Sequence, residues 1–115
     1  MTVLEDKDIK DNKDDWRGGL RDFSSGRNAS EKDWFMSWRH ILEQITGTTY
    51  EEFEPVLFSK RSVHGKGTNY SVKYKGDSEF IHVKLFKPLP GSKGNPELLD
   101  VVPGLDVTSP LSTTF

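Results

Sequence analysis

The chain has 115 residues, of which 33% are hydrophobic and 30% charged, and its formal net charge at pH 7 is −2. This length suits one domain with a modest core, and the composition is that of a globular domain. The absence of cysteine excludes a disulfide framework, a thiolate metal site and a cysteine nucleophile, and it favours a reducing, cytoplasmic compartment.

The N-terminal segment is acidic, because residues 1–15 contain six Asp or Glu against three Lys, a charge of −3. We expect residues 1–16 to form a disordered acidic extension and residues 17–115 to form one domain. The remainder of the chain is then close to +1, since the total is −2, which gives nucleic-acid binding no support. No stretch has transmembrane length and the N-terminus lacks a signal-peptide core, so no membrane partner is expected.

A helix is predicted from about Ser30, where Ser30 and Asp33 resemble a capping box, to the stop signal at Gly47. Its apolar residues recur at spacings of three and four, which indicates an amphipathic helix: Trp34, Phe35, Trp38, Ile41, Leu42 and Ile45. We expect this face, including both tryptophans, to pack against a sheet.

Four strand-like segments follow the helix, at 53–62, 68–75, 79–87 and 97–102. The second and third alternate between apolar and polar residues, whereas Pro55 in the first implies a bulge or an edge position. Residues 89–96 form a loop rich in Pro and Gly. One helix followed by antiparallel strands predicts an α+β fold in which a sheet covers the helix.

The most informative segment is Arg61-Ser62-Val63-His64-Gly65, between the first two strands. We expect Val63 to project into solvent at the tip of a hairpin, and exposed apolar residues of this kind commonly fill a cleft in a partner. Ser62 and His64 are not accompanied by an orienting carboxylate, so the segment does not predict a hydrolase. The three histidines of the chain lie on different elements, so neither a metal site nor a cofactor is expected.

Three segments in this order and spacing are similar to the inhibitory segments of the stefins, the type 1, disulfide-free branch of the cystatins. Gly18-Gly19-Leu20 resembles the glycine-bearing N-terminal trunk, and residues 61–65 fall on the Gln-x-Val-x-Gly signature of the first hairpin loop. Leu89-Pro90-Gly91 resembles the second hairpin loop. The resemblance extends from about Gly18 to Phe115, with further matches at 68–70 and 82–86.

The resemblance implies a cystatin-like fold, in which an antiparallel sheet of four to five strands wraps around one long helix. It also implies a reversible, competitive inhibitor of papain-like cysteine proteases (cathepsins) that is not itself an enzyme. The residues expected to bind the protease are Gly18, Gly19, Leu20, Arg61, Ser62, Val63, His64, Gly65, Leu89, Pro90 and Gly91. A monomer is expected, and exchange of a strained hairpin between two chains is the alternative.

Two departures from the family pattern leave a second hypothesis open. Arg61 replaces the signature glutamine, and Lys66-Gly67 is inserted before Thr68, which would lengthen the hairpin by roughly 3 Å. Either change could weaken or abolish inhibition. The alternative function is therefore a cystatin-fold interaction module whose loops bind another protein.

Overall fold

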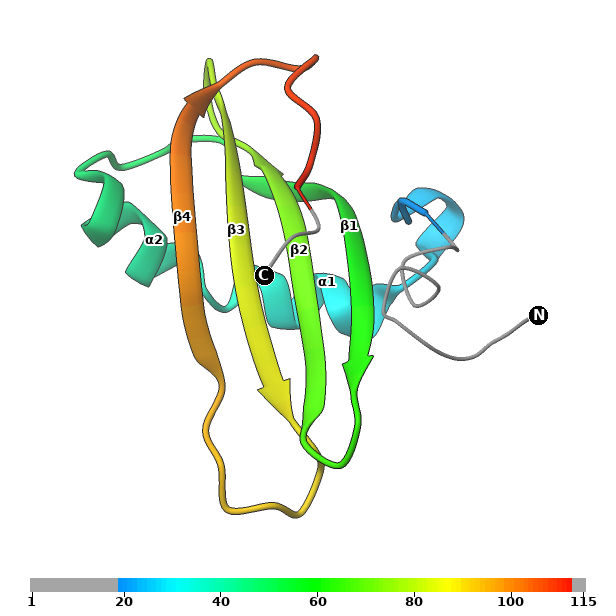
Figure 1. Cartoon of the computed structure of the whole chain (residues 1–115). Coiled ribbons are helices and arrows are strands. Elements are labelled where there is room, and N and C mark those ends of the chain that lie inside the picture. Colours follow the sequence, from blue (N-terminus) through cyan, green and yellow to red (C-terminus); the bar gives the residue numbers. More distant parts are fainter. Residues whose placement is uncertain (1–18, 113–115) are drawn as a thin grey trace.

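The computed structural model describes residues 19–112 and contains a four-stranded antiparallel sheet in the order β1-β2-β3-β4 (Figure 1). The strands are β1 (Glu54–Val63), β2 (Gly67–Lys75), β3 (Phe80–Pro88) and β4 (Glu97–Leu105). The short 3₁₀ turn η3 (Ser24–Gly26) precedes the helices α1 (Ala29–Met36) and α2 (Arg39–Thr46), which lie on one side of the sheet. The predicted α+β class is confirmed.

The core is an aromatic and aliphatic cluster between α1 and the sheet. Phe35 of α1 is completely buried, and its ring lies 5.1 Å from that of Phe58 on β1 and 5.4 Å from that of Tyr70 on β2. The alternation predicted for the two central strands is confirmed, because one face of each is buried: Tyr70, Val72, Tyr74, Ile81, Val83 and Leu85. Successive strand residues point to opposite faces, so this pattern fixes which face meets the helix.

Instead of one long helix, the structure has two, separated at Ser37 and Trp38. The Ser37 hydroxyl donates a hydrogen bond to the Trp34 carbonyl, an interaction that bends helices. The Phe35 carbonyl accepts hydrogen bonds from the Trp38 N–H at 3.2 Å and from the Tyr74 hydroxyl at 2.8 Å. Burial raises the pKa of Tyr74, so its phenol stays a donor to α1. The Tyr74 hydroxyl of the sheet thus bonds to the Phe35 carbonyl, which in a continuous helix would accept a hydrogen bond from the N–H of Arg39.

The second helix is held by polar contacts with the segment that leads into β1. The Arg39 guanidinium donates to the Tyr50 carbonyl and lies 5.7 Å from the centre of the Phe53 ring. The Glu43 carboxylate accepts a hydrogen bond from the Tyr50 N–H at 2.9 Å. Because this face of α2 is turned inward, Ile41 and Ile45 are exposed (42% and 55%), contrary to the predicted burial of the whole apolar stripe.

The C-terminal segment crosses the outer face of the sheet after β4, which extends to Leu105 beyond the predicted end at Val102. The Ser71 hydroxyl donates to the Ser112 carbonyl, and the Lys73 ammonium donates to the Val107 carbonyl at 3.2 Å. Both β2 side chains are buried as a result. Neither helix within residues 19–112 is long and apolar enough to cross a membrane.

Candidate functional site

The first hairpin loop joins β1 to β2 through three residues, His64, Gly65 and Lys66. The Lys66 N–H donates to the Val63 carbonyl at 2.9 Å, and Val63 stands opposite Gly67 in the strand register. Gly65 has a φ of +72°, a left-handed conformation that glycine adopts with little strain. Gly65 is the third residue of the turn that this hydrogen bond closes, and a glycine of positive φ at that position is the pattern of a type II turn.

The second loop, between β3 and β4, begins with a tight turn over Leu89-Pro90-Gly91-Ser92. The Ser92 N–H donates to the Leu89 carbonyl at 3.1 Å, and Gly91 has a φ of +83°. Proline followed by glycine with positive φ is the pattern of a type II turn. Leu89 is 45% exposed, and Pro90 beside it is exposed as well, so a rigid turn presents both apolar side chains to solvent.

The two loops lie at the same end of the sheet (Figure 1). A backbone hydrogen bond joins them. The Leu89 N–H donates to the Lys66 carbonyl at 3.0 Å, and Gly67 stands opposite Pro88 in the register of β2 and β3. A Cβ atom at Gly67 would lie 2.1 Å from the Lys87 carbonyl oxygen. The two residues inserted relative to the family pattern, Lys66 and Gly67, therefore form the junction between the loops.

The segment before α1 pairs with the outer edge of the sheet. Arg21 and Phe58 form an isolated antiparallel bridge, with N–H to carbonyl distances of 2.8 and 3.0 Å. The Gly19 carbonyl accepts a hydrogen bond from the Ser59 hydroxyl at 3.4 Å. In an antiparallel pair, moving toward the N-terminus from Arg21 corresponds to moving along β1 toward Val63. Leu20 is 54% exposed, whereas Gly18 lies outside the described residues.

An aromatic side chain anchors this segment to the core. The Phe23 ring stacks on Phe58 at 5.5 Å between centroids and meets Phe35 edge-on at 6.2 Å. Phe23 and the bridge at Arg21 together hold the exposed residues Gly19 and Leu20 beside β1. Sequence reasoning did not assign a role to Phe23 or Arg21. The available signal was an aromatic residue just before the helix and after a glycine-rich segment.

The predicted site residues differ in exposure. Ser62, His64 and Gly65 are exposed, whereas Arg61 and Val63 are half-buried. The expectation that Val63 projects into solvent is therefore met only in part. As the last residue of β1, Val63 still belongs to the ladder, opposite Gly67, and its side chain is partly buried.

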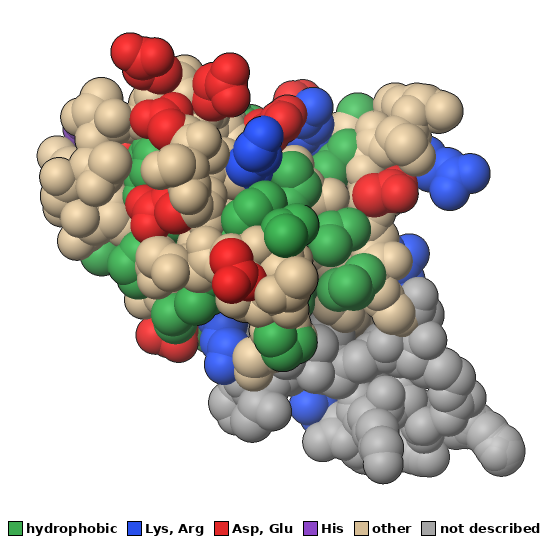
Figure 2. Space-filling view, turned by 90° about the horizontal axis from the view of Figure 1, so that it is seen from above, with side chains coloured by type: hydrophobic (Ala, Val, Ile, Leu, Met, Phe, Trp, Pro, Cys, Tyr) green, Lys and Arg blue, Asp and Glu red, His purple; other side chains and the backbone are tan. Residues whose placement is uncertain are grey.

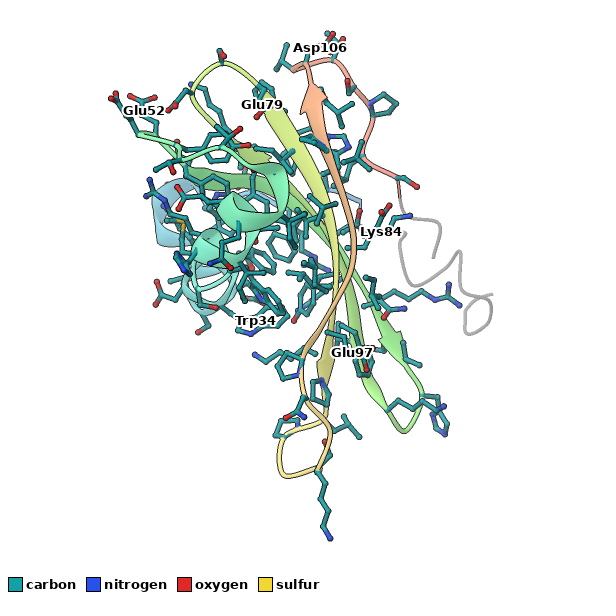
Figure 3. All side chains as sticks on the ribbon, turned by 90° about the vertical axis from the view of Figure 1, so that its left-hand side faces the viewer. Trp34, Glu52, Glu79, Lys84, Glu97 and Asp106 are labelled. Carbon is teal, nitrogen blue, oxygen red and sulfur yellow. The ribbon has the colours of Figure 1, made fainter. Side chains whose placement is uncertain are left out.

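A pocket of about 380 Å³ lies away from these loops, between the outer face of the sheet and the C-terminal segment. His82, Lys84 and Asp100 are among its lining residues, and Figure 3 shows Lys84 on this side of the sheet. Burial and then the positive charge of Lys73 lower the pKa of His82. Within residues 19–112, no group of three His, Asp or Glu side chains is placed to hold a metal ion.

Comparison with curated proteins identifies relatives, although no family model matches the chain. The chain is 44% identical over 50 residues to cystatin-A of Bos taurus. The matched segment makes up 43% of this chain and 49% of that protein. It is 43% identical over 51 residues to cystatin-A of Homo sapiens, or 44% of this chain and 50% of the relative. These matches support the stefin-type cystatin family as the group that this part of the chain resembles.

A further relative, leukocyte cysteine proteinase inhibitor 1 of Sus scrofa, is 38% identical over 50 residues, or 43% of this chain and 47% of that protein. The chain spans about half the length of the curated relatives it matches. The resemblance to stefins predicted from the three segments is confirmed at the level of the family. The α+β fold, with an antiparallel sheet covering helices on one side, is consistent with it.

Proposed function

We propose that this stefin-type chain is a reversible, competitive inhibitor of papain-like cysteine proteases. Its wedge would consist of the trunk at Gly18, Gly19 and Leu20 and the two hairpin loops. The observation that carries the proposal is the hydrogen bond from the Leu89 N–H to the Lys66 carbonyl, which joins both loops at one end of the sheet. The bridged segment at Arg21 lies along the edge strand that leads to the same end.

The chemistry of such a wedge explains inhibition without cleavage. The chain around Val63 is closed into a turn by the Lys66 N–H to Val63 carbonyl hydrogen bond, so it cannot extend along a catalytic cleft as a substrate does. Leu20, Val63, Leu89 and Pro90 supply apolar contacts, and the turn at Pro90 loses little conformational entropy on binding. The proposed mechanism is steric blockade with no covalent step, no cofactor and no catalytic residue of its own.

The glycine at position 19 has a physical role in this proposal. Its φ is +72°, and a Cβ atom added at this position would have no other atom of the chain within 4 Å. Packing within the chain therefore leaves room for a side chain at this position. The conformation favours glycine, and a glycine also lets a partner's surface approach the backbone closely. We expect cathepsin-type proteases as partners, in the cytoplasm, because a chain without cysteine suits a reducing compartment.

The test is a titration of a papain-like protease with the full chain, followed with a fluorogenic peptide substrate. We expect competitive inhibition with a dissociation constant below about 1 μM, which corresponds to about 8 kcal/mol of binding free energy. Val63→Asp should abolish inhibition, because it places a charge in an apolar subsite. Val107→Asp is the matched control, since Val107 is 67% exposed at the other end of the sheet.

Removal of residues 1–19 tests the trunk separately. We expect weaker inhibition, mainly through faster dissociation, because a peripheral contact is lost while the loops remain. An unchanged dissociation rate would show that the trunk assignment is wrong even if the loops inhibit.

A second candidate function is an interaction module for another protein, and Arg61 together with the Lys66-Gly67 insertion favours it. Lack of inhibition of several papain-like proteases at about 50 μM chain, with the fold intact by circular dichroism, would support the module.

A further inference from the structure

The loop end of the sheet is strongly basic although the chain as a whole is slightly acidic. The three segments that meet or lead there, at 19–21, 61–68 and 86–96, contain five Lys or Arg and no Asp or Glu. These cations are Arg21, Arg61, Lys66, Lys87 and Lys93, and His64 lies among them. A net charge close to zero for the domain gives no sign of a basic surface in the sequence. The basic residues are nevertheless concentrated in these three segments.

The opposite end of the sheet is acidic. The connections at 47–54, 76–79 and 103–108 contain six Asp or Glu and no Lys or Arg. Figure 2 looks onto this end and shows acidic side chains spread across it, and Figure 3 labels three of them: Glu52, Glu79 and Asp106. The molecule therefore has a positive end and a negative end.

Each segment of the proposed wedge carries positive side chains beside its apolar residues. Lys66 and Lys93 are exposed at the tips of the first and second loops, and Arg21 is exposed at the trunk. The Lys87 ammonium lies 5.1 Å from the centre of the Trp34 ring, a cation–π contact that fixes one more charge behind the second loop. Glu97, the first acidic residue after the second loop, begins β4 (Figure 3).

We propose that the loop end recognises a papain-like protease whose cleft is rimmed by acidic side chains, and that Lys66, Lys93 and Arg21 accelerate the encounter. This inference rests on the proposed inhibition and names the class of protease. Exposed cations beside exposed apolar residues match a cleft that has apolar subsites and a rim of opposite charge. Charges at such a rim change mainly the association rate constant and its dependence on salt.

The arrangement favours a protein cleft over nucleic acid. Single-stranded nucleic acid is bound by a charged groove that follows its backbone, with exposed aromatic rings on which bases stack. At the loop end the exposed apolar side chains are aliphatic, Leu20, Leu89 and Pro90. Trp34 is half-buried, with the Lys87 ammonium 5.1 Å from the centre of its ring.

The experiment measures the association and dissociation rate constants of the full chain with a papain-like protease chosen for an acidic cleft rim, from about 20 to 500 mM salt. Lys66→Glu/Lys93→Glu is compared with Lys32→Glu/Lys75→Glu, which changes the net charge equally but on α1 and at the acidic end of β2. At low salt we expect the first variant to associate at least about tenfold more slowly and the control within about threefold of the parent chain. The dissociation rate constants of both variants should stay within about threefold of the parent chain's value. High salt should remove the difference in association rate between the two variants.

A protease variant in which rim Asp and Glu are replaced by Asn and Gln should associate equally with both double variants. Inhibition by the parent chain with no effect of salt or of Lys66→Glu/Lys93→Glu would overturn the inference and leave the inhibitor function standing. Absence of inhibition by the parent chain would overturn both. Sub-micromolar binding of a fluorescent single-stranded oligonucleotide at about 150 mM salt, lost in Lys66→Glu/Lys93→Glu, would identify a nucleic-acid surface instead.

Discussion

At the loop end of the sheet the backbone turns at Gly65 and at Pro90-Gly91, and one hydrogen bond, from the Leu89 N–H to the Lys66 carbonyl, joins the turns. At the opposite end, carboxylates join the connections. The Glu79 carboxylate accepts from the Tyr50 hydroxyl and the Gly104 N–H, each at 2.6 Å. The Asp77 carboxylate accepts from the backbone N–H groups of residues 51 and 52 at 3.2 and 2.7 Å.

This comparison indicates that the acidic end contributes mainly to stability and the loop end mainly to binding. Acidic side chains at one end satisfy backbone donors that would otherwise lack partners, so their charge is used within the fold. Cations at the other end are largely exposed, and glycine and proline set the course of the backbone there. Substitutions of the bonded carboxylates at the acidic end should therefore affect folding, and substitutions of the exposed cations at the loop end should affect binding.

The largest loss of stability is expected from a substitution in the core between α1 and the sheet. Phe35→Ala removes a completely buried ring between the helix and the sheet and should lower the free energy of unfolding by about 3–5 kcal/mol. Urea unfolding followed by circular dichroism measures it, with Ile45→Ala as an exposed control that should change stability by less than about 0.5 kcal/mol. Similar losses in the two variants would contradict the assigned core.

Gly67→Ala should be the most damaging change at the loop end. Its Cβ would lie 2.1 Å from the Lys87 carbonyl oxygen and 2.8 Å from the Pro88 Cα, and backbone atoms cannot move as a side chain can. We expect a loss of about 2–3 kcal/mol of stability. Protease inhibition should weaken further than the unfolded fraction explains, because the loops move apart. An Ala variant with the stability and inhibition of the parent chain would show that the loops are not coupled through Gly67.

Glu79→Ala tests the acidic end. Loss of the hydrogen bonds to Tyr50 and Gly104 should lower the free energy of unfolding by about 1.5 kcal/mol and leave the inhibition constant unchanged at temperatures where the chain is folded. Glu52→Ala removes an exposed carboxylate at the same end and serves as the control. A weaker inhibition constant for folded Glu79→Ala would break the division between the two ends.

The smallest effect is a dependence of stability on pH that neither end controls. Burial and the charge of Lys73 lower the pKa of His82 in the fold below the ordinary value of 6.5, and Lys84 and Asp100 face the same pocket. Protonation therefore favours the unfolded chain. The contribution of neutral His82 is complete above about pH 6.5 and is lost as the pH falls through the lowered pKa. The melting temperature should fall less between pH 7.5 and 5 in His82→Gln than in the parent chain, and His40→Gln should behave like the parent.

The sequence by itself determined the strands and the turns. Alternation at Tyr70, Val72 and Tyr74 fixes the buried face of β2 because side chains alternate along any strand. Glycine at position 91 after Pro90 specifies a tight turn because few other residues adopt a positive φ at so little cost. The three candidate binding segments are predicted from the resemblance to stefins, because a glycine in a short motif does not by itself indicate a binding site.

Tertiary structure alone decided the features that depend on segments distant in the chain. The helix divides at Ser37 and Trp38 where the Tyr74 hydroxyl reaches the Phe35 carbonyl, a contact that helical periodicity cannot register. The inserted Lys66 and Gly67 become the junction of two loops only because β2 lies beside β3. The charges of residues 19–112, which sum to zero, separate into a basic and an acidic end through the antiparallel order of the strands. Electrostatic attraction depends on distance in space, and a sum along the chain contains no distances.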